Sequence, residues 1–394
     1  MSPTDEQHRE AGVDLLDARV PAAETLPPLA RLTRPFHTRA ALGLQAAPAP
    51  ALVFVPAGFV LGPRALGALS DEALAFLDIA VSVALAALGI FIGLALDVRH
   101  RADRRLLAAA SAEALVTLGV VAGAMLFLVG RWRLPLDVPP LIAVLTLGVC
   151  AAASAASAGH DQSDPVKPLA TRIADLDDVL PILVGAYVLG LLRAADPAAA
   201  ATLALATAAT GAAVGAAGWL LFEDARGAPE RGVFVLGAVV LLGGSAAYTG
   251  QSALFAGMAA GLLWRLAPGG ADRIVREDLR RIQHPLVVLL LLVAGASLVP
   301  SRVALWLLAP IALFRLVGKL LGGWAASRLA PGKAAPADLG AYLIPPGVIG
   351  IGFALAFHQF HPSPTGTAIL TATALASLVG ELLAVAALAE LRRS

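Results

Sequence analysis

Residues 171–185 read TRIADLDDVLPILVG and place three carboxylates at the start of an apolar run that continues to Leu192. A charged group inside an apolar segment is costly, so each of these acids needs a structural or functional reason. Asp175 can serve as a helix cap, because acids stabilise the amino-terminal ends of helices. Asp177 and Asp178 are neighbours, point about 100° apart in a helix, and cannot both face one solvated edge. Like charges this close repel each other, so an unpartnered pair would keep at least one proton, and we interpret this pair as acids suited to carrying protons.

The composition of the whole chain agrees with a membrane location for this stretch. The 394 residues are 58% hydrophobic and 14% charged, with a mean hydropathy of +0.79. These values predict an all-α polytopic membrane protein with the lipid bilayer as its surroundings. The net charge of +1 gives no indication of nucleic-acid binding, and the single Cys150 excludes an internal disulfide. Residues 1–45 are polar and lack the apolar core of a signal peptide, so we expect a flexible cytoplasmic arm before a membrane domain at 46–394.

Twelve apolar runs are long enough to cross a bilayer, since a membrane-spanning helix needs about 20 such residues. The seventh and eighth runs could be two short helices or one long bent helix, because both would give the same pattern. If the amino terminus is cytoplasmic, 22 of the 29 basic residues lie on the cytoplasmic side. The positive-inside rule then predicts that both termini are cytoplasmic. The runs cover roughly residues 43–63, 73–97, 106–129, 138–157, 173–192, 198–222, 231–247, 249–264, 283–299, 303–329, 338–358 and 366–389.

The interior of the tenth run contains two cations, Arg315 and Lys319, which are four residues apart and share one helix face. Lys319 could extend its ammonium toward the cytoplasmic interface, which is harder for Arg315. Only three of the 29 basic residues are lysines, so a lysine at this position is informative. A buried lysine can lose its proton and an arginine effectively cannot. We interpret Asp177, Asp178 and Lys319 as partners in a functional group of buried charges.

Other intramembrane residues are weaker candidates for the same site. Glu113 in the third run and Glu381 in the twelfth are single acids, which often only form hydrogen bonds between helices. The fourth run contains small residues at 149–159, and the eleventh contains Pro-Pro-Gly within 344–353, which cannot form a continuous helix. Broken helices at membrane depth line the binding sites of many transporters. The fourth run, which is easily broken, precedes the fifth run with its acids. The eleventh run, which is also easily broken, follows the tenth run with its cations. This mirrored order is expected of an inverted repeat.

Five stretches resemble motifs of the cation:proton antiporter superfamily, the sodium/proton exchangers of NhaA and NapA type. The resemblance covers about residues 50–390, with the motifs in the family's order. It implies an NhaA-like fold of about 12 transmembrane helices, with inverted repeats and two broken helices that cross. The motifs are VPAGFVLGP at 55–63, LGIFIGL at 88–94, ADLDDVL at 174–180, SALFAGMAAG at 252–261 and GKLLG at 318–322.

The resemblance assigns roles to the candidate residues by their positions in these motifs. It implies that Asp178 is the principal carrier of the cation and the proton, and that Asp177 pairs with Lys319. The threonine that the family usually has near the fourth-run break is absent here, and Ser154 is the nearest candidate to replace it. Paired aspartates are typical of the electrogenic members of the family.

The resemblance also implies an organisation and a function for the whole chain. Core transport helices are expected at about 106–193 and 302–390, and scaffold helices that form a homodimer at about 46–98 and 231–299. The expected protein lies in the bacterial inner membrane, exchanges Na⁺ or Li⁺ for protons, needs no cofactor and is not an enzyme. Potassium/proton exchange and a non-transporting membrane sensor with the same fold stay open as alternatives. An intramembrane aspartyl protease is disfavoured, because no second run offers an aspartate at comparable depth.

Overall fold

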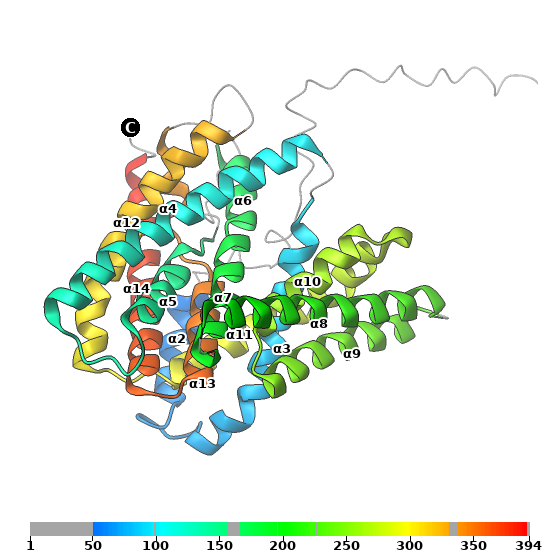
Figure 1. Cartoon of the computed structure of the whole chain (residues 1–394), viewed down its shortest axis with the longest axis horizontal. Coiled ribbons are helices and arrows are strands. Elements are labelled where there is room, and N and C mark those ends of the chain that lie inside the picture. Colours follow the sequence, from blue (N-terminus) through cyan, green and yellow to red (C-terminus); the bar gives the residue numbers. More distant parts are fainter. Residues whose placement is uncertain are drawn as a thin grey trace, which may run out of the picture. The chain divides into compact units, whose positions relative to one another are not determined.

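The computed structural model describes residues 50–97, 100–155, 166–194, 196–225, 227–330 and 337–391. The arm expected at 1–45 and the end of the weak stretch, residues 156–159, lie outside this set. Every regular element in the described part of the chain is a helix (Figure 1). The helices are α2 (Pro50–Leu61), α3 (Asp71–Ala95), α4 (Arg101–Trp132), α5 (Pro140–Ala152), α6 (Lys167–Leu176), α7 (Val179–Arg193), α8 (Pro197–Asp224), α9 (Ala228–Thr249), α10 (Ala253–Leu266), η2 (Pro268–Gly270), α11 (Ala271–Ala296), α12 (Arg302–Leu329), η3 (Ala337–Leu343), α13 (Val348–Phe360) and α14 (Pro364–Leu391).

All twelve predicted apolar runs contain helix. Seven helices are long and apolar enough to cross a membrane, namely α3, α4, α8, α9, α11, α12 and α14. The apolar helices α2, α5, α10 and α13 are shorter. The fifth run is divided between α6 and α7, and the eleventh between η3 and α13. The chain is therefore an all-α polytopic protein, as predicted.

The open boundary between the seventh and eighth runs is a turn between two helices. Gly250 follows α9 with a φ of 64°, a left-handed conformation that glycine adopts without steric cost. Ser252 then caps α10, because its side chain accepts a hydrogen bond from the N–H of Phe255. A single long bent helix is therefore excluded.

Several helices begin earlier than their apolar runs, and the difference is largest for α6 and α11. The structure starts α6 at Lys167 rather than at residue 173, and α11 at Ala271 rather than at residue 283. In both cases the added residues are largely polar, and hydropathy alone does not detect a helix that continues beyond the hydrocarbon. Asp175 lies eight residues after the start of α6. The prediction that it caps the start of a helix is therefore wrong.

Several helix pairs approach each other through glycines, among them α2 with α11 and α3 with α10. A Cβ atom added at Gly58 of α2 would lie 2.1 Å from the carbonyl oxygen of Leu292 in α11. A Cβ atom added at Gly89 of α3 would lie 2.0 Å from the carbonyl oxygen of Leu254 in α10. Small residues spaced in this way let helix backbones pack closely within a membrane. Four of the five motifs behind the family resemblance are thus helix-packing surfaces, because Gly318 and Gly322 of the GKLLG stretch meet α4 in the same way.

The packing of the helices repeats between the two halves of the chain. If the first five runs are matched in order with the last five, α2 corresponds to α10 and α3 corresponds to α11. The contact of α2 with α11 then corresponds to the contact of α10 with α3. In the same matching, α4 corresponds to α12, α5 to η3 and α7 to α14. The contact of α4 with α5 then corresponds to the contact of α12 with η3. Likewise, the contact of α5 with α7 corresponds to the contact of η3 with α14. Equivalent runs are seven apart, an odd number, so the halves have opposite orientations if each run crosses the membrane once. The packing therefore agrees with the predicted inverted repeat.

The fourth and eleventh runs are broken where they cross. The chain is extended at Ser154, after α5, and Ser154 forms an isolated antiparallel bridge with Pro346. The N–H of Ala155 donates to the carbonyl of Pro345 at 2.8 Å, and the N–H of Gly347 to that of Ala153 at 3.3 Å. Proline has no N–H for a helix, which explains the break in the eleventh run. The two predicted breaks thus satisfy each other's backbone groups within the membrane.

Candidate functional site

The fifth run is interrupted at its two adjacent acids. Asp177 follows the last residue of α6, and Asp178 precedes the first residue of α7. Pro181 has no N–H to donate to the carbonyl of Asp177, whereas the N–H of Ile182 donates to the carbonyl of Asp178 at 3.0 Å. Both side chains are fully buried. The sequence thus places two carboxylates, out of contact with water, at a junction between helices.

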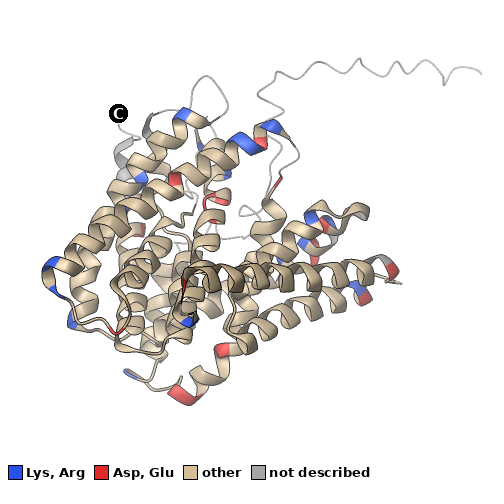
Figure 2. Cartoon of the chain, viewed as in Figure 1, with Lys and Arg blue, Asp and Glu red and all other residues tan. Residues whose placement is uncertain are grey.

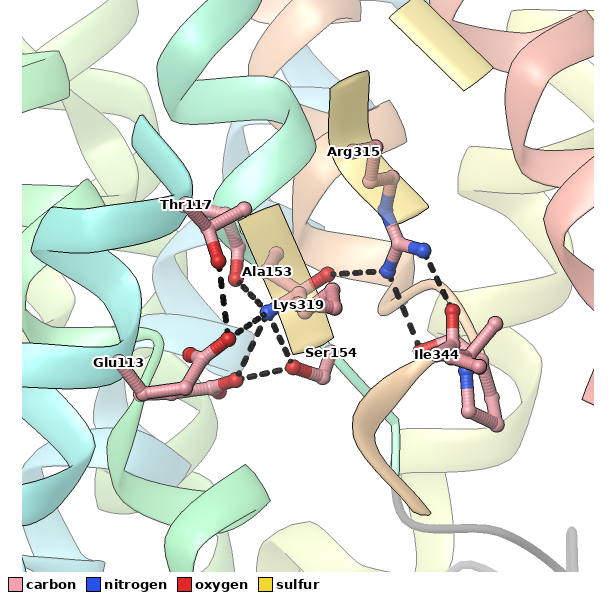
Figure 3. A network of polar contacts seen from close by, with 10 residues as sticks. Glu113, Thr117, Ala153, Ser154, Arg315, Lys319 and Ile344 are labelled. Atoms are coloured by element: carbon pink, nitrogen blue, oxygen red, sulfur yellow. Dashed lines mark hydrogen bonds and ion pairs between the residues drawn. The ribbon is translucent and has the colours of Figure 1, made fainter. Parts of the chain in front are cut away.

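Lys319 lies at the centre of a buried polar network (Figure 3). Its ammonium nitrogen is 3.0 Å from Oε1 of Glu113 and 3.4 Å from Oδ2 of Asp177. It also donates to the hydroxyl of Ser154 at 2.6 Å and to the carbonyl of Ala152. The structure therefore brings together Asp177, Lys319, Ser154 and Glu113, which come from four different elements.

Two hydroxyl groups orient the carboxylates of this network. Ser154 accepts from Lys319 and donates to Oδ2 of Asp177, so it connects the ammonium to this acid. Thr117 donates to Oε1 of Glu113 at 3.0 Å. The sequence interpretation missed Thr117, although its spacing of four residues from Glu113 puts both on one helix face.

Arg315, one turn before Lys319, contacts the two broken segments. Its guanidinium donates to the carbonyls of Ala153 at 3.1 Å and Pro345 at 3.3 Å, and also to that of Ile344 (Figure 3). Carbonyls at a helix end lack helical partners and carry partial negative charge. The two buried cations of α12 therefore have different partners: Lys319 contacts two acids, Ser154 and one carbonyl, whereas Arg315 contacts three backbone carbonyls at the crossing.

The remaining predicted residues lie outside the contacts of Lys319. Asp178 is fully buried but is not among the groups that this ammonium touches. Asp175 is buried in the last turn of α6. Glu381, half-buried on α14, is close enough to Arg315 for a coulombic interaction, but forms no ion pair within the described residues.

A second group of charges lies where several helices end, and Figure 2 shows that many of the charged residues lie near helix ends. Arg172 pairs with Asp103 at 2.5 Å, and Arg265 with Asp97 at 2.6 Å and Asp272 at 2.7 Å. His100 lies within 3.8 Å of Asp97 and Asp103, a spacing that could hold a metal ion. Both acids already pair with arginines, so the geometry favours a structural role. We call Asp97, His100, Asp103, Arg172, Arg265 and Asp272 the helix-end cluster.

Comparisons with known proteins bear on the fold. No protein-family model matches the sequence, and a search of curated proteins finds no significant match. Among solved structures, the chain is similar to the sodium proton antiporter MjNhaP1 from Methanocaldococcus jannaschii at pH 8, with a TM-score of 0.61 and 17% sequence identity. The match covers 89% of this chain and 98% of that chain. The chain therefore has the fold of a cation:proton antiporter.

Proposed function

We propose that this protein is a secondary active transporter that exchanges a monovalent cation, Na⁺ or Li⁺, for protons by alternating access. The observation that carries the proposal is the position of Asp177 and Asp178. Both are fully buried at a helix junction, and Asp177 is hydrogen-bonded to Ser154 at the crossing of the two broken segments. Hard cations prefer oxygen ligands, and unwound helices at membrane depth coordinate such ions in transporters.

Competition for the carboxylates couples the two substrates. Without the cation, Asp178 holds a proton and Asp177 pairs with Lys319, which lies 3.4 Å away in the structure. The cation binds once Asp178 has lost its proton, and it displaces Lys319 from Asp177. In this scheme the site binds a proton or the cation but not both, and it opens to the other side of the membrane only when one of them is bound. Flux should therefore rise with pH until the supply of protons becomes limiting.

We assign the movement to the core helices at about 106–193 and 302–390, relative to the scaffold at about 46–98 and 231–299. Two copies are expected to associate through the scaffold in a bacterial inner membrane, with both termini cytoplasmic. The family resemblance favours electrogenic exchange, which requires a second proton to leave together with that of Asp178. The steps above release one proton per cation, so the effect of an imposed membrane potential on flux decides between electroneutral and electrogenic exchange.

The decisive experiment is proton flux in proteoliposomes driven by gradients of Na⁺, Li⁺ or K⁺, with and without an imposed membrane potential. Asp178→Asn should abolish the flux, because the amide cannot exchange a proton. Asp71→Asn is the matched control, since Asp71 is exposed in the first turn of α3. Flux that survives Asp178→Asn would overturn the assignment of this residue. A wild-type protein that moves protons with none of the three cations would overturn the function.

A further inference from the structure

Glu113, rather than Asp177, is the acid closest to Lys319. Its Oε1 lies 3.0 Å from the ammonium nitrogen, against 3.4 Å for Oδ2 of Asp177. All three side chains are fully buried, and Thr117 donates a hydrogen bond to the same Glu113 oxygen. One ammonium thus lies between two carboxylates that come from different helices.

The packing of α4 against α12 fixes the contact between Glu113 and Lys319. A Cβ atom added at Gly322 would lie 2.7 Å from the carbonyl oxygen of Glu113, and one added at Gly318 would lie 3.0 Å from the Cα of Thr117. The two glycines are one turn apart and flank Lys319 in the GKLLG stretch. Because they lack side chains, α4 can approach and bring Glu113 beside the ammonium.

The two acids differ in what holds them. Glu113 lies within the long helix α4, whereas Asp177 lies at the junction of α6 and α7. A change in backbone conformation at that junction would move Asp177 without disturbing the packing of α4 on α12. The Asp177 contact can therefore break while the Glu113 contact persists.

The proposed exchange requires Lys319 to leave Asp177 when the cation binds. A buried ammonium without any carboxylate partner is strongly unfavourable, and this cost would oppose cation binding. We propose that Glu113 is the permanent counter-ion of Lys319, a positioning residue that holds the ammonium while the cation occupies Asp177 and Asp178. This inference rests on the proposed function.

Binding of Na⁺, Li⁺ and K⁺ to the purified full-length protein, measured by titration calorimetry, tests the role of Glu113. For whichever cation the wild type binds, Glu113→Gln should raise the Kd about tenfold, because it leaves the displaced ammonium unpaired. Glu72→Gln, at an exposed position in the first turn of α3, should leave the Kd unchanged. Glu113→Asp keeps the charge and should restore the Kd to within about threefold of wild type.

A double-mutant cycle separates this role from a structural one. In a Lys319→Gln background there is no ammonium to hold, so adding Glu113→Gln should change the Kd by less than about twofold. If Glu113→Gln does not fold, Thr117→Val decides instead. It removes the hydroxyl that stabilises the Glu113 carboxylate, and it should raise the Kd about two- to threefold.

The outcomes distinguish the inference from the function. A wild-type Kd in Glu113→Gln, or in Thr117→Val if only that variant folds, would overturn the inference and leave the exchanger intact. An equal effect of Glu113→Gln with and without Lys319 would also overturn it. A wild-type protein that binds and transports none of the three cations would overturn both proposals.

Discussion

The charges around Lys319 and the helix-end cluster use the same chemistry in opposite surroundings. Around Lys319, two carboxylates share one ammonium, and all three groups are fully buried. In the helix-end cluster, Arg172 and Arg265 each pair with aspartate, and all of these side chains are partly exposed. Each group has one more carboxylate than lysine or arginine, but the first is closed off from water, whereas the second reaches solvent.

This difference decides what each group can do. A partly exposed charge that loses its partner is solvated again, so the pair contributes little to stability. A buried charge that loses its partner keeps the full desolvation cost. The surplus negative charge around Lys319 can be neutralised by a proton or a cation, and only there does binding strongly change the energy of the site.

The largest expected effect is that of removing the buried cation. Lys319→Ala leaves Glu113 and Asp177 without their shared ammonium, and should destabilise the fold by about 3–5 kcal/mol. Thermal unfolding in detergent measures the loss, and Lys333→Ala is the control, since Lys333 lies outside the described residues and the predicted apolar runs. If Lys319→Ala melts at the wild-type temperature, the buried carboxylates of Glu113 and Asp177 do not depend on the ammonium for stability.

The next effect comes from the packing that holds the buried group together. Gly322→Ala places a Cβ atom 2.7 Å from the backbone oxygen of Glu113, and should destabilise the protein by about 1–3 kcal/mol. Gly123→Ala on α4 is the matched control, because its Cβ would meet nothing within 4 Å. That change should alter stability by less than about 1 kcal/mol. Equal effects of the two substitutions would contradict the close packing of α4 on α12.

A smaller effect is expected in the helix-end cluster. Arg172→Ala should cost about 1 kcal/mol or less, because its pair with Asp103 is partly exposed. The cost should shrink as salt is added, since ions screen exposed charges. Unfolding measured at low and high ionic strength tests this expectation. A cost as large as that of Lys319→Ala would remove the contrast between the two regions.

The smallest effect concerns Asp137, in the loop between α4 and α5. Burial raises the pKa of Asp137, but hydrogen bonds from Thr365, Ser363 and His361 outweigh it and hold the pKa below the ordinary value of 3.8. A carboxyl with a lowered pKa in the folded state stabilises the protein above its unfolded pKa, and this contribution disappears as the pH falls through the folded value. Asp137→Asn should therefore lower the melting temperature slightly at pH 6 and by less at about pH 3, because the contribution is lost as the pH falls below 3.8. The same loss at both pH values would contradict an electrostatic origin.

Much of the fold follows from local features of the sequence. Apolar runs locate the helices, and Pro345 and Pro346 locate one break, because both effects act within a few residues. The starts of α6 and α11 were harder to predict, because their polar first turns do not contribute to hydropathy.

The site was only partly predictable, because its partners lie far apart in the sequence. Asp177 and Lys319 stand out as charges in apolar runs, and the family resemblance paired them. The shorter contact of Lys319 with Glu113 depends on how α4 packs against α12, which a single sequence does not encode locally. The different partners of Arg315 and Lys319 likewise depend on where the two broken segments cross.

The glycine contacts of α2 with α11 and of α3 with α10 also constrain how the protein is made. Each contact joins an early helix to a late one, so neither half of the chain can complete its own interior. During synthesis, α2 must remain in the bilayer with its glycine surface uncovered until α11 has been inserted. The packing of α2 on α11 therefore forms late, and a ribosome that stops before Ala271 leaves behind a chain in which α2 has no α11 to pack against.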